Sequence, residues 1–219
     1  GSSALLAHLG QITAIAPSSA IALDDTTATA AHVNDGPGSL FALMTAPSLT
    51  VSGVPVAGIA ALFTPASGVV LPASVTVSDT ATAIQTDLAG ASPVLVQYRA
   101  DITAITASPG GDTISLDADH ALVHGVADGA GSVFALLSGA SLAVTGAAVG
   151  QLDALAGLTV TPTSVAVSDT ADQIAQDLIS GTALATYAGS GLVTAIASTT
   201  GDVSIDFPHL TAPVIAALA

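Results

Sequence analysis

Two kinds of hydrophobic pattern alternate along the chain. Runs of β-branched or alternating residues predict strands, of which the clearest lie at 102–105, 113–116, 141–144 and 164–167. Between them, apolar residues recur at three- and four-residue steps and predict helices. These are a long stretch at 122–137 that glycines break in two, a short helix around Leu152, and one that ends near Gly181. Because strands separated by helices require crossover connections, we expect parallel pairing.

The chain also repeats itself at an interval of about ninety residues. Three segments recur in order: Val-Ser-Asp-Thr-Ala at 77–81 and 167–171, a Gly-x-Gly-Ser-x-Phe-Ala-Leu stretch at 36–43 and 129–136, and Ile/Val-Thr-Ala-Ile at 12–15, 102–105 and 193–196. Self-similarity at a fixed period is the signature of a repeat architecture. The elements predicted between 101 and 191 can be followed in the same order in the first copy.

The repeat divides the chain into units. We expect the end of one repeat at 1–10, a full repeat at 11–100, a second at 101–191 and a partial third at 192–219, all in one continuous solenoid. The predicted fold is α/β, with strand–helix modules, a parallel sheet on one side and short helices on the other. A doubly wound sheet is the main alternative. The extra strand after the glycine turn is expected to add a second, narrower sheet along one edge. Because the chain begins and ends in mid-repeat, we expect it to be a fragment of a longer array.

Composition narrows the range of partners. Hydrophobic residues make up 51% of the chain, yet only six are aromatic, which suits thin stacked layers. The formal charge is −15 with Arg99 as the single Lys or Arg, so phosphate backbones and anionic lipid surfaces would repel the chain. No apolar run approaches the roughly 18 residues of a membrane helix. The absence of cysteine removes disulfides and thiolate metal sites.

The repeated Ser-Asp-Thr segment has a structural interpretation. Asp79, Thr80, Asp169 and Thr170 are predicted to cap the helices that follow them by accepting hydrogen bonds from free N–H groups. The aspartates that close equivalent strands are expected to act in the same way; they are Asp24, Asp117 and Asp206. The alternative is that these three carboxylates bind calcium, which requires six to eight oxygen ligands.

Other conspicuous residues also have structural interpretations. His120 and His124 share one face of a helix at a spacing that zinc sites use, but the first copy has Thr27 and Ala31 there. We therefore predict an exposed histidine pair that is structurally neutral and binds no metal. Arg99 is expected to interact with a helix C-terminus or a neighbouring carboxylate. Phe134 and its equivalent, Phe41, are predicted to be core residues.

The chain resembles the repeats of very large bacterial secreted or cell-surface proteins of the adhesin type. The resemblance rests on Val-Ser-Asp-Thr-Ala-x-x-Ile-x-x-x-Leu, the Leu-x-Val-[ST]-Gly segments and the Ile-Thr-Ala-Ile strands quoted above. It implies an extracellular or cell-surface location and an adhesive, matrix-forming role as in a biofilm, and it supplies no catalytic residues. No glycine-rich phosphate loop with lysine, nucleophile elbow or cysteine nucleophile occurs either.

These observations predict a non-enzymatic structural or adhesive repeat module that acts as a spacer or a self-associating unit. Its expected partners are other copies of the repeat or surface and matrix components, with no nucleic acid and no transmembrane segment. The alternative is a glycan- or protein-binding module that uses the solenoid surface, stabilised by calcium if a cofactor is involved. The scarcity of aromatic residues counts against glycan binding.

Overall fold

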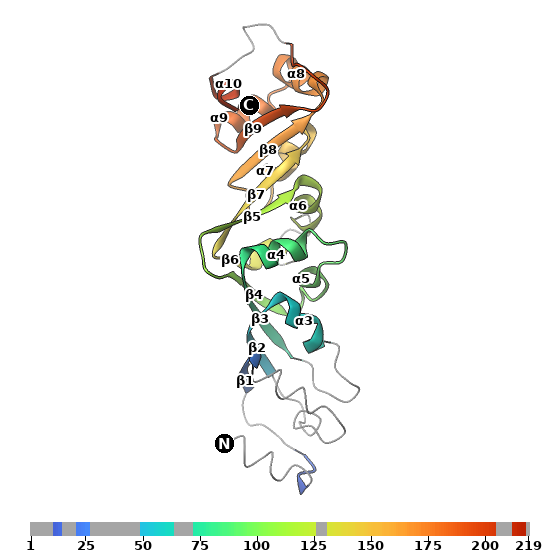
Figure 1. Cartoon of the computed structure of the whole chain (residues 1–219), viewed down its shortest axis with the longest axis vertical. Coiled ribbons are helices and arrows are strands. Elements are labelled where there is room, and N and C mark those ends of the chain that lie inside the picture. The colour runs from blue at the N-terminus through green and yellow to red at the C-terminus, as the bar shows by residue number, and fades with distance from the viewer. Residues whose placement is uncertain are drawn as a thin grey trace.

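The computed structural model describes residues 11–14, 21–26, 49–63, 72–125, 131–204 and 212–217. Within them the chain is an α/β protein with two parallel sheets. Figure 1 shows an elongated body along which the chain advances from β1 (Ile21–Asp24), near one end, to β9 (Val193–Ser198), near the other.

Strand order follows chain order in both sheets. The first sheet is formed by β1, β2 (Leu49–Val54), β3 (Ser74–Asp79), β4 (Ile102–Ala107) and β6 (Leu137–Ser138). The second is formed by β5 (Asp112–Asp117), β7 (Ala140–Ala147), β8 (Ser164–Asp169) and β9. Every pairing between neighbouring strands is parallel, which confirms the pairing expected from the strand–helix alternation.

The division into two sheets differs from the single main sheet that the sequence predicts. The second sheet is not a narrow addition, because it contains four strands against five in the first. The two sheets meet where two neighbouring chain segments bend together. One is the turn at 108–111 between β4 and β5, and the other is Gly139 between β6 and β7.

Gly139 explains why the second bend can lie so close to the first. Its φ of 78° is a left-handed conformation that glycine adopts without strain. A Cβ atom on this residue would lie 2.6 Å from the carbonyl oxygen of Ala107. The Gly111 N–H donates to the Gly139 carbonyl at 2.7 Å. The two bends are thus held together, and the chain passes from one sheet to the other at this point.

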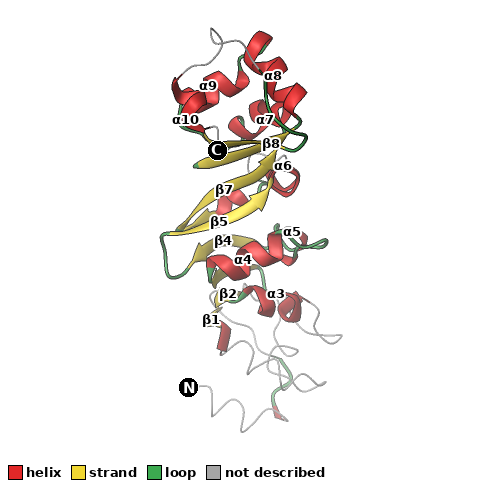
Figure 2. Cartoon of the chain, turned by 45° about the horizontal axis from the view of Figure 1, so that its top comes forward, coloured by secondary structure: helices red, strands yellow, loops and turns green. Residues whose placement is uncertain are grey.

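Short helices connect the strands (Figure 2). They are α3 (Val56–Phe63), α4 (Ala81–Leu88), α5 (Val94–Gln97), α6 (Ala118–Gly125), α7 (Leu152–Ala156), α8 (Ala171–Ser180), α9 (Ala183–Gly189) and α10 (Ala212–Ala217), with 3-10 turns η2 (Phe134–Leu136) and η3 (Val149–Gln151). The helices α7 and α8 lie where the apolar periodicity predicts them, and α6 overlaps the start of the stretch predicted at 122–137, whereas α5, α9 and α10 were not predicted. No helix of the described residues is long and apolar enough to cross a membrane.

The core is a thin layer between sheets and helices. On β3, Val75 and Val77 are buried and alternate with partly exposed Thr76 and Ser78, and β8 has the same burial pattern. Helix residues close the layer from the other side, such as the fully buried Ile84. The opposite face of the sheets carries mostly serine, threonine and alanine.

Phe134 is buried, with 1% of its surface exposed, as the sequence predicts for a core residue. Its counterpart Phe41, and the positions 27 and 31 that correspond to the histidines, lie outside the described residues.

Candidate functional site

The aspartates of the repeated pentapeptide connect one strand–helix layer to the layer before it. One carboxylate oxygen of Asp79 accepts from the N–H of Thr80 at 2.7 Å, and the other accepts from the N–H of Val56 at 2.9 Å. Val56 is the first residue of α3, so Asp79 satisfies a free N–H at the start of the preceding helix. The sequence predicts that Asp79 caps the following helix, and this detail is wrong.

Asp169 makes the same two contacts in the second half of the chain. Its oxygens accept from the N–H groups of Thr170 at 2.7 Å and of Val149 at 2.9 Å. Val149 is the first residue of η3, which occupies the place of α3. The prediction that Asp169 caps the helix after it is therefore wrong for the same reason: its side chain reaches back across the sheet, to a residue twenty positions earlier.

The threonines of the pentapeptide cap the helices that follow them. The Thr80 hydroxyl oxygen accepts from the N–H of Ala83 at 3.1 Å at the start of α4. The Thr170 hydroxyl oxygen accepts from the N–H of Gln173 at 3.3 Å at the start of α8. Each pentapeptide therefore serves two helices, because its aspartate caps the one before and its threonine caps the one after.

A second pair of aspartate caps was missed in the sequence. The Asp87 carboxylate accepts from the N–H groups of Val94 and Leu95 at 2.9 and 3.0 Å and thereby caps α5. The Asp177 carboxylate accepts from the N–H of Leu184 at 2.9 Å, at the start of α9. The signal was present, since each aspartate precedes a leucine and lies ten residues after the valine of its pentapeptide.

The calcium candidates are not brought together. Asp24 ends β1 in the first sheet and Asp117 ends β5 in the second, while Asp206 lies outside the described residues. Within the described ranges no three His, Cys, Asp or Glu side chains are placed to hold a metal ion. At the end of β1, burial is the main cause that raises the pKa of Asp25, and the adjacent Asp24 carboxylate adds to it.

Asp117 contacts a histidine. Its carboxylate accepts from the His120 N–H at 2.9 Å and lies 2.6 Å from His120 Nδ1. The backbone hydrogen bond from His120 is the main cause that holds the pKa of Asp117 below its ordinary value. Asp117 thus caps α6, the helix that follows it.

The prediction of an exposed histidine pair is wrong for His124. This side chain is only 8% exposed, and its Nε2 lies 2.8 Å from the carbonyl oxygen of Leu88, the last residue of α4. Its Nδ1 is buried and has no hydrogen-bond partner among the described residues. His124 thus reaches the end of another helix, a contact that periodicity within either helix does not reveal.

Further polar contacts join the two halves near His124. The N–H of Ser115 in β5 donates to the Gln85 side chain of α4 at 2.8 Å. The Arg99 Nε donates to the backbone carbonyl of Ser132 at 3.0 Å. Arg99 therefore contacts the turn that precedes η2.

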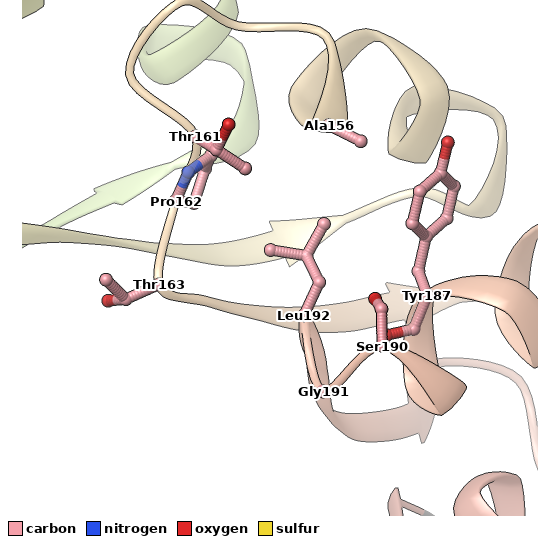
Figure 3. Close-up of a pocket in the computed structure, with 8 residues that line it drawn as sticks. All are labelled: Ala156, Thr161, Pro162, Thr163, Tyr187, Ser190, Gly191 and Leu192. Atoms are coloured by element: carbon pink, nitrogen blue, oxygen red, sulfur yellow. The ribbon is translucent and has the colours of Figure 1, made fainter.

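A shallow pocket of about 340 Å³ lies in the helix layer of the second half. Figure 3 shows the side chains of Tyr187 and Leu192 on the side of the hollow where α9 leads into β9, Ala156 at the end of α7, and Thr161 with Pro162 across from Tyr187. The Tyr187 hydroxyl donates to Asp153 at 2.8 Å, and this hydrogen bond is the main cause that raises the pKa of Tyr187.

Comparisons with protein families, with curated proteins and with solved structures found no match to this chain. The site chemistry therefore has to be interpreted from the geometry alone. The aspartates described above accept hydrogen bonds from the chain itself, which is a structural use of carboxylates.

Proposed function

We propose that this chain is a structural repeat module of a bacterial secreted or cell-surface protein and acts as a spacer. Its strand–helix layers stack as a solenoid with a unit of about ninety residues. The observation that carries the proposal is the duplicated aspartate link. Asp79 and Asp169, at equivalent places in the sequence repeat, make the same pair of hydrogen bonds at the same distances.

The order of the strands supports the spacer role. Since each strand pairs in parallel with the next strand of its own sheet, every added module lengthens the body and leaves its width unchanged. One repeat adds three strand spacings to the body, the number that separates β1 from β4. At the usual separation of neighbouring strands, this corresponds to about 14 Å. The bacterial surface location rests on the resemblance of the sequence motifs.

The outer face of the sheets also suits a spacer. Threonine hydroxyls on this face donate to carbonyls of the neighbouring strand, as Thr103 does to Val75 at 3.2 Å and Thr194 to Val165 at 3.5 Å. With a charge of −15 over the chain, such a surface favours solubility over non-specific adhesion. This surface therefore favours the spacer function over self-association.

Small-angle X-ray scattering of a lengthened chain tests the spacer function. We would compare the chain with a variant in which residues 101–191 occur twice in succession. The maximum dimension should increase by about 14 Å, while the cross-sectional radius of gyration stays the same. A larger cross-section, or a scattering profile of two separate bodies, would contradict the proposal. Light scattering against concentration tests self-association separately.

A further inference from the structure

The pocket beside Tyr187 occupies a place that an aromatic ring fills in the other half of the chain. By the sequence repeat, Tyr187 corresponds to Tyr98, and Ala156 at the end of α7 corresponds to Phe63 at the end of α3. The rings of Phe63 and Tyr98 stack, with their centroids 4.8 Å apart and their planes inclined by 14°. In the second half the alanine leaves the Tyr187 ring without this partner.

Two backbone hydrogen bonds beside the two places are equivalent. The Ala73 N–H donates to the Leu49 carbonyl at 2.8 Å, and Thr163, its equivalent, donates to Leu142 at the same distance. Immediately next to these bonds, the Val75 N–H donates to Asp101, and the Val165 N–H donates to Leu192 in the same way. The pocket therefore arises where Ala156 replaces Phe63 and where the segment between the tyrosine and the next strand is two residues longer, at 188–192 against 99–101.

Tyr187 is held in position by a contact that the first half lacks. Its hydroxyl donates to Asp153 at 2.8 Å, and the residue that corresponds to Asp153 is Ala60, which has no side-chain acceptor. The ring is thus fixed at its hydroxyl, and no other ring among the described residues stacks on it. A ring that is already fixed loses little conformational entropy when another ring stacks on it, which favours binding.

Hydroxyl groups around the pocket offer hydrogen-bond acceptors. Those of Thr161 and Ser190 donate their protons to the backbone carbonyls of Leu158 and Tyr187, respectively. Because the protons are engaged, the oxygen lone pairs remain for a ligand that donates. A tyrosine hydroxyl or an indole N–H is such a donor on an aromatic ring.

We propose that this pocket binds one aromatic side chain of a partner polypeptide, stacked on the ring of Tyr187 in the place that Phe63 occupies beside Tyr98. A tyrosine or tryptophan fits best, because it combines the flat ring with a donor for the surrounding hydroxyls. The volume of about 340 Å³ accommodates one side chain and lies at the small end of ligand pockets. This site is independent of the spacer role, and either can fail without the other.

An NMR titration of the full chain with N-acetyl-tyrosinamide tests the proposal. We expect saturable shifts of the amide signals of Tyr187, Gly191 and Leu192. The Ala156→Phe variant should abolish them, because the new ring fills the pocket. The Tyr187→Leu variant should weaken binding by about two- to tenfold, the usual contribution of an aromatic pair beyond its buried area.

The first half provides a matched gain-of-function variant. Phe63→Ala should open an equivalent pocket and add saturable shifts around Tyr98, while leaving those around Tyr187 in place. No saturable shifts in the unmodified chain, or shifts that Ala156→Phe leaves unchanged, would overturn the proposal. So would a response to methyl glucoside in place of the tyrosine derivative, since it would identify a sugar site.

Discussion

Replacing Asp169 by asparagine should destabilise the protein by about 1.5–2 kcal/mol. The Asp169 carboxylate accepts two backbone hydrogen bonds, from Thr170 at 2.7 Å and Val149 at 2.9 Å. A hydrogen bond to a charged group contributes about 1.5–3 kcal/mol, and an amide retains only one of the two acceptor oxygens. Because the side chain is partly exposed, we take the lower part of this range. Asp169→Ala removes both acceptors and should cost about 3 kcal/mol.

Urea denaturation followed by circular dichroism measures this difference in the free energy of unfolding, and the slope of the transition should not change. Asp79→Asn is the matched variant in the first half and should give a value within about 0.5 kcal/mol of Asp169→Asn. Asp112→Asn is the control. The substitution removes the same charge, and the exposed Asp112 side chain accepts no hydrogen bond from the described residues. It should change stability by less than about 0.5 kcal/mol. If Asp169→Asn were no more destabilising than Asp112→Asn, the structural role assigned to the carboxylate would be refuted.

Four further predictions follow from the same contacts. Gly139→Ala should cost at least about 2 kcal/mol by urea denaturation, because φ is 78° and the added Cβ would meet a backbone oxygen at 2.6 Å, whereas Gly150→Ala, with open space, should be near neutral. His124→Leu should cost about 2 kcal/mol by losing a buried hydrogen bond, while Val123→Ala, 70% exposed on the same helix, should have little effect; equal effects would argue against the contact. The folded-state pKa of Asp117 is lowered, so its contribution is present above its unfolded pKa of about 3.9 and is lost as pH falls through the folded value. The stability difference between the chain and Asp117→Asn, less than about 1 kcal/mol at this exposed site, should therefore be seen at pH 6 and vanish in strong acid. Calcium or EDTA should leave the melting temperature unchanged, and a rise with calcium would show a metal site.

The local elements could be predicted from the sequence because they depend on local patterns. The valine alternation at 164–167 gave β8, and Ile174 with Leu178 gave the buried face of α8. Parallel pairing followed from the same alternation of strands and helices. Thr80 and Thr170 could be identified as candidate caps because an N-cap lies next to the helix it serves.

What could not be predicted depends on which layers become neighbours. From the sequence, the Asp79 side chain could reach either the helix that follows it or the preceding strand–helix layer. The strand register determines that it accepts from Val56, in the preceding layer. Similarly, the hydrogen-bond partner of His124 is the Leu88 carbonyl, which belongs to another helix. The transition between the sheets at Gly139 requires two bends of the chain to lie side by side. The sequence shows that a glycine is present, but it does not show which part of the chain will pack against it.

Amide hydrogen exchange at Val56 and Val149 tests the central claim most directly, namely that equivalent aspartates hold equivalent layers in the two halves. We expect both amides to exchange slowly in the unmodified chain, as hydrogen-bonded amides in packed elements do. Asp79→Asn should speed exchange at Val56 and leave Val149 protected, and Asp169→Asn should do the reverse. Fast exchange at both amides in the unmodified chain, or no site-specific response to either variant, would contradict the account.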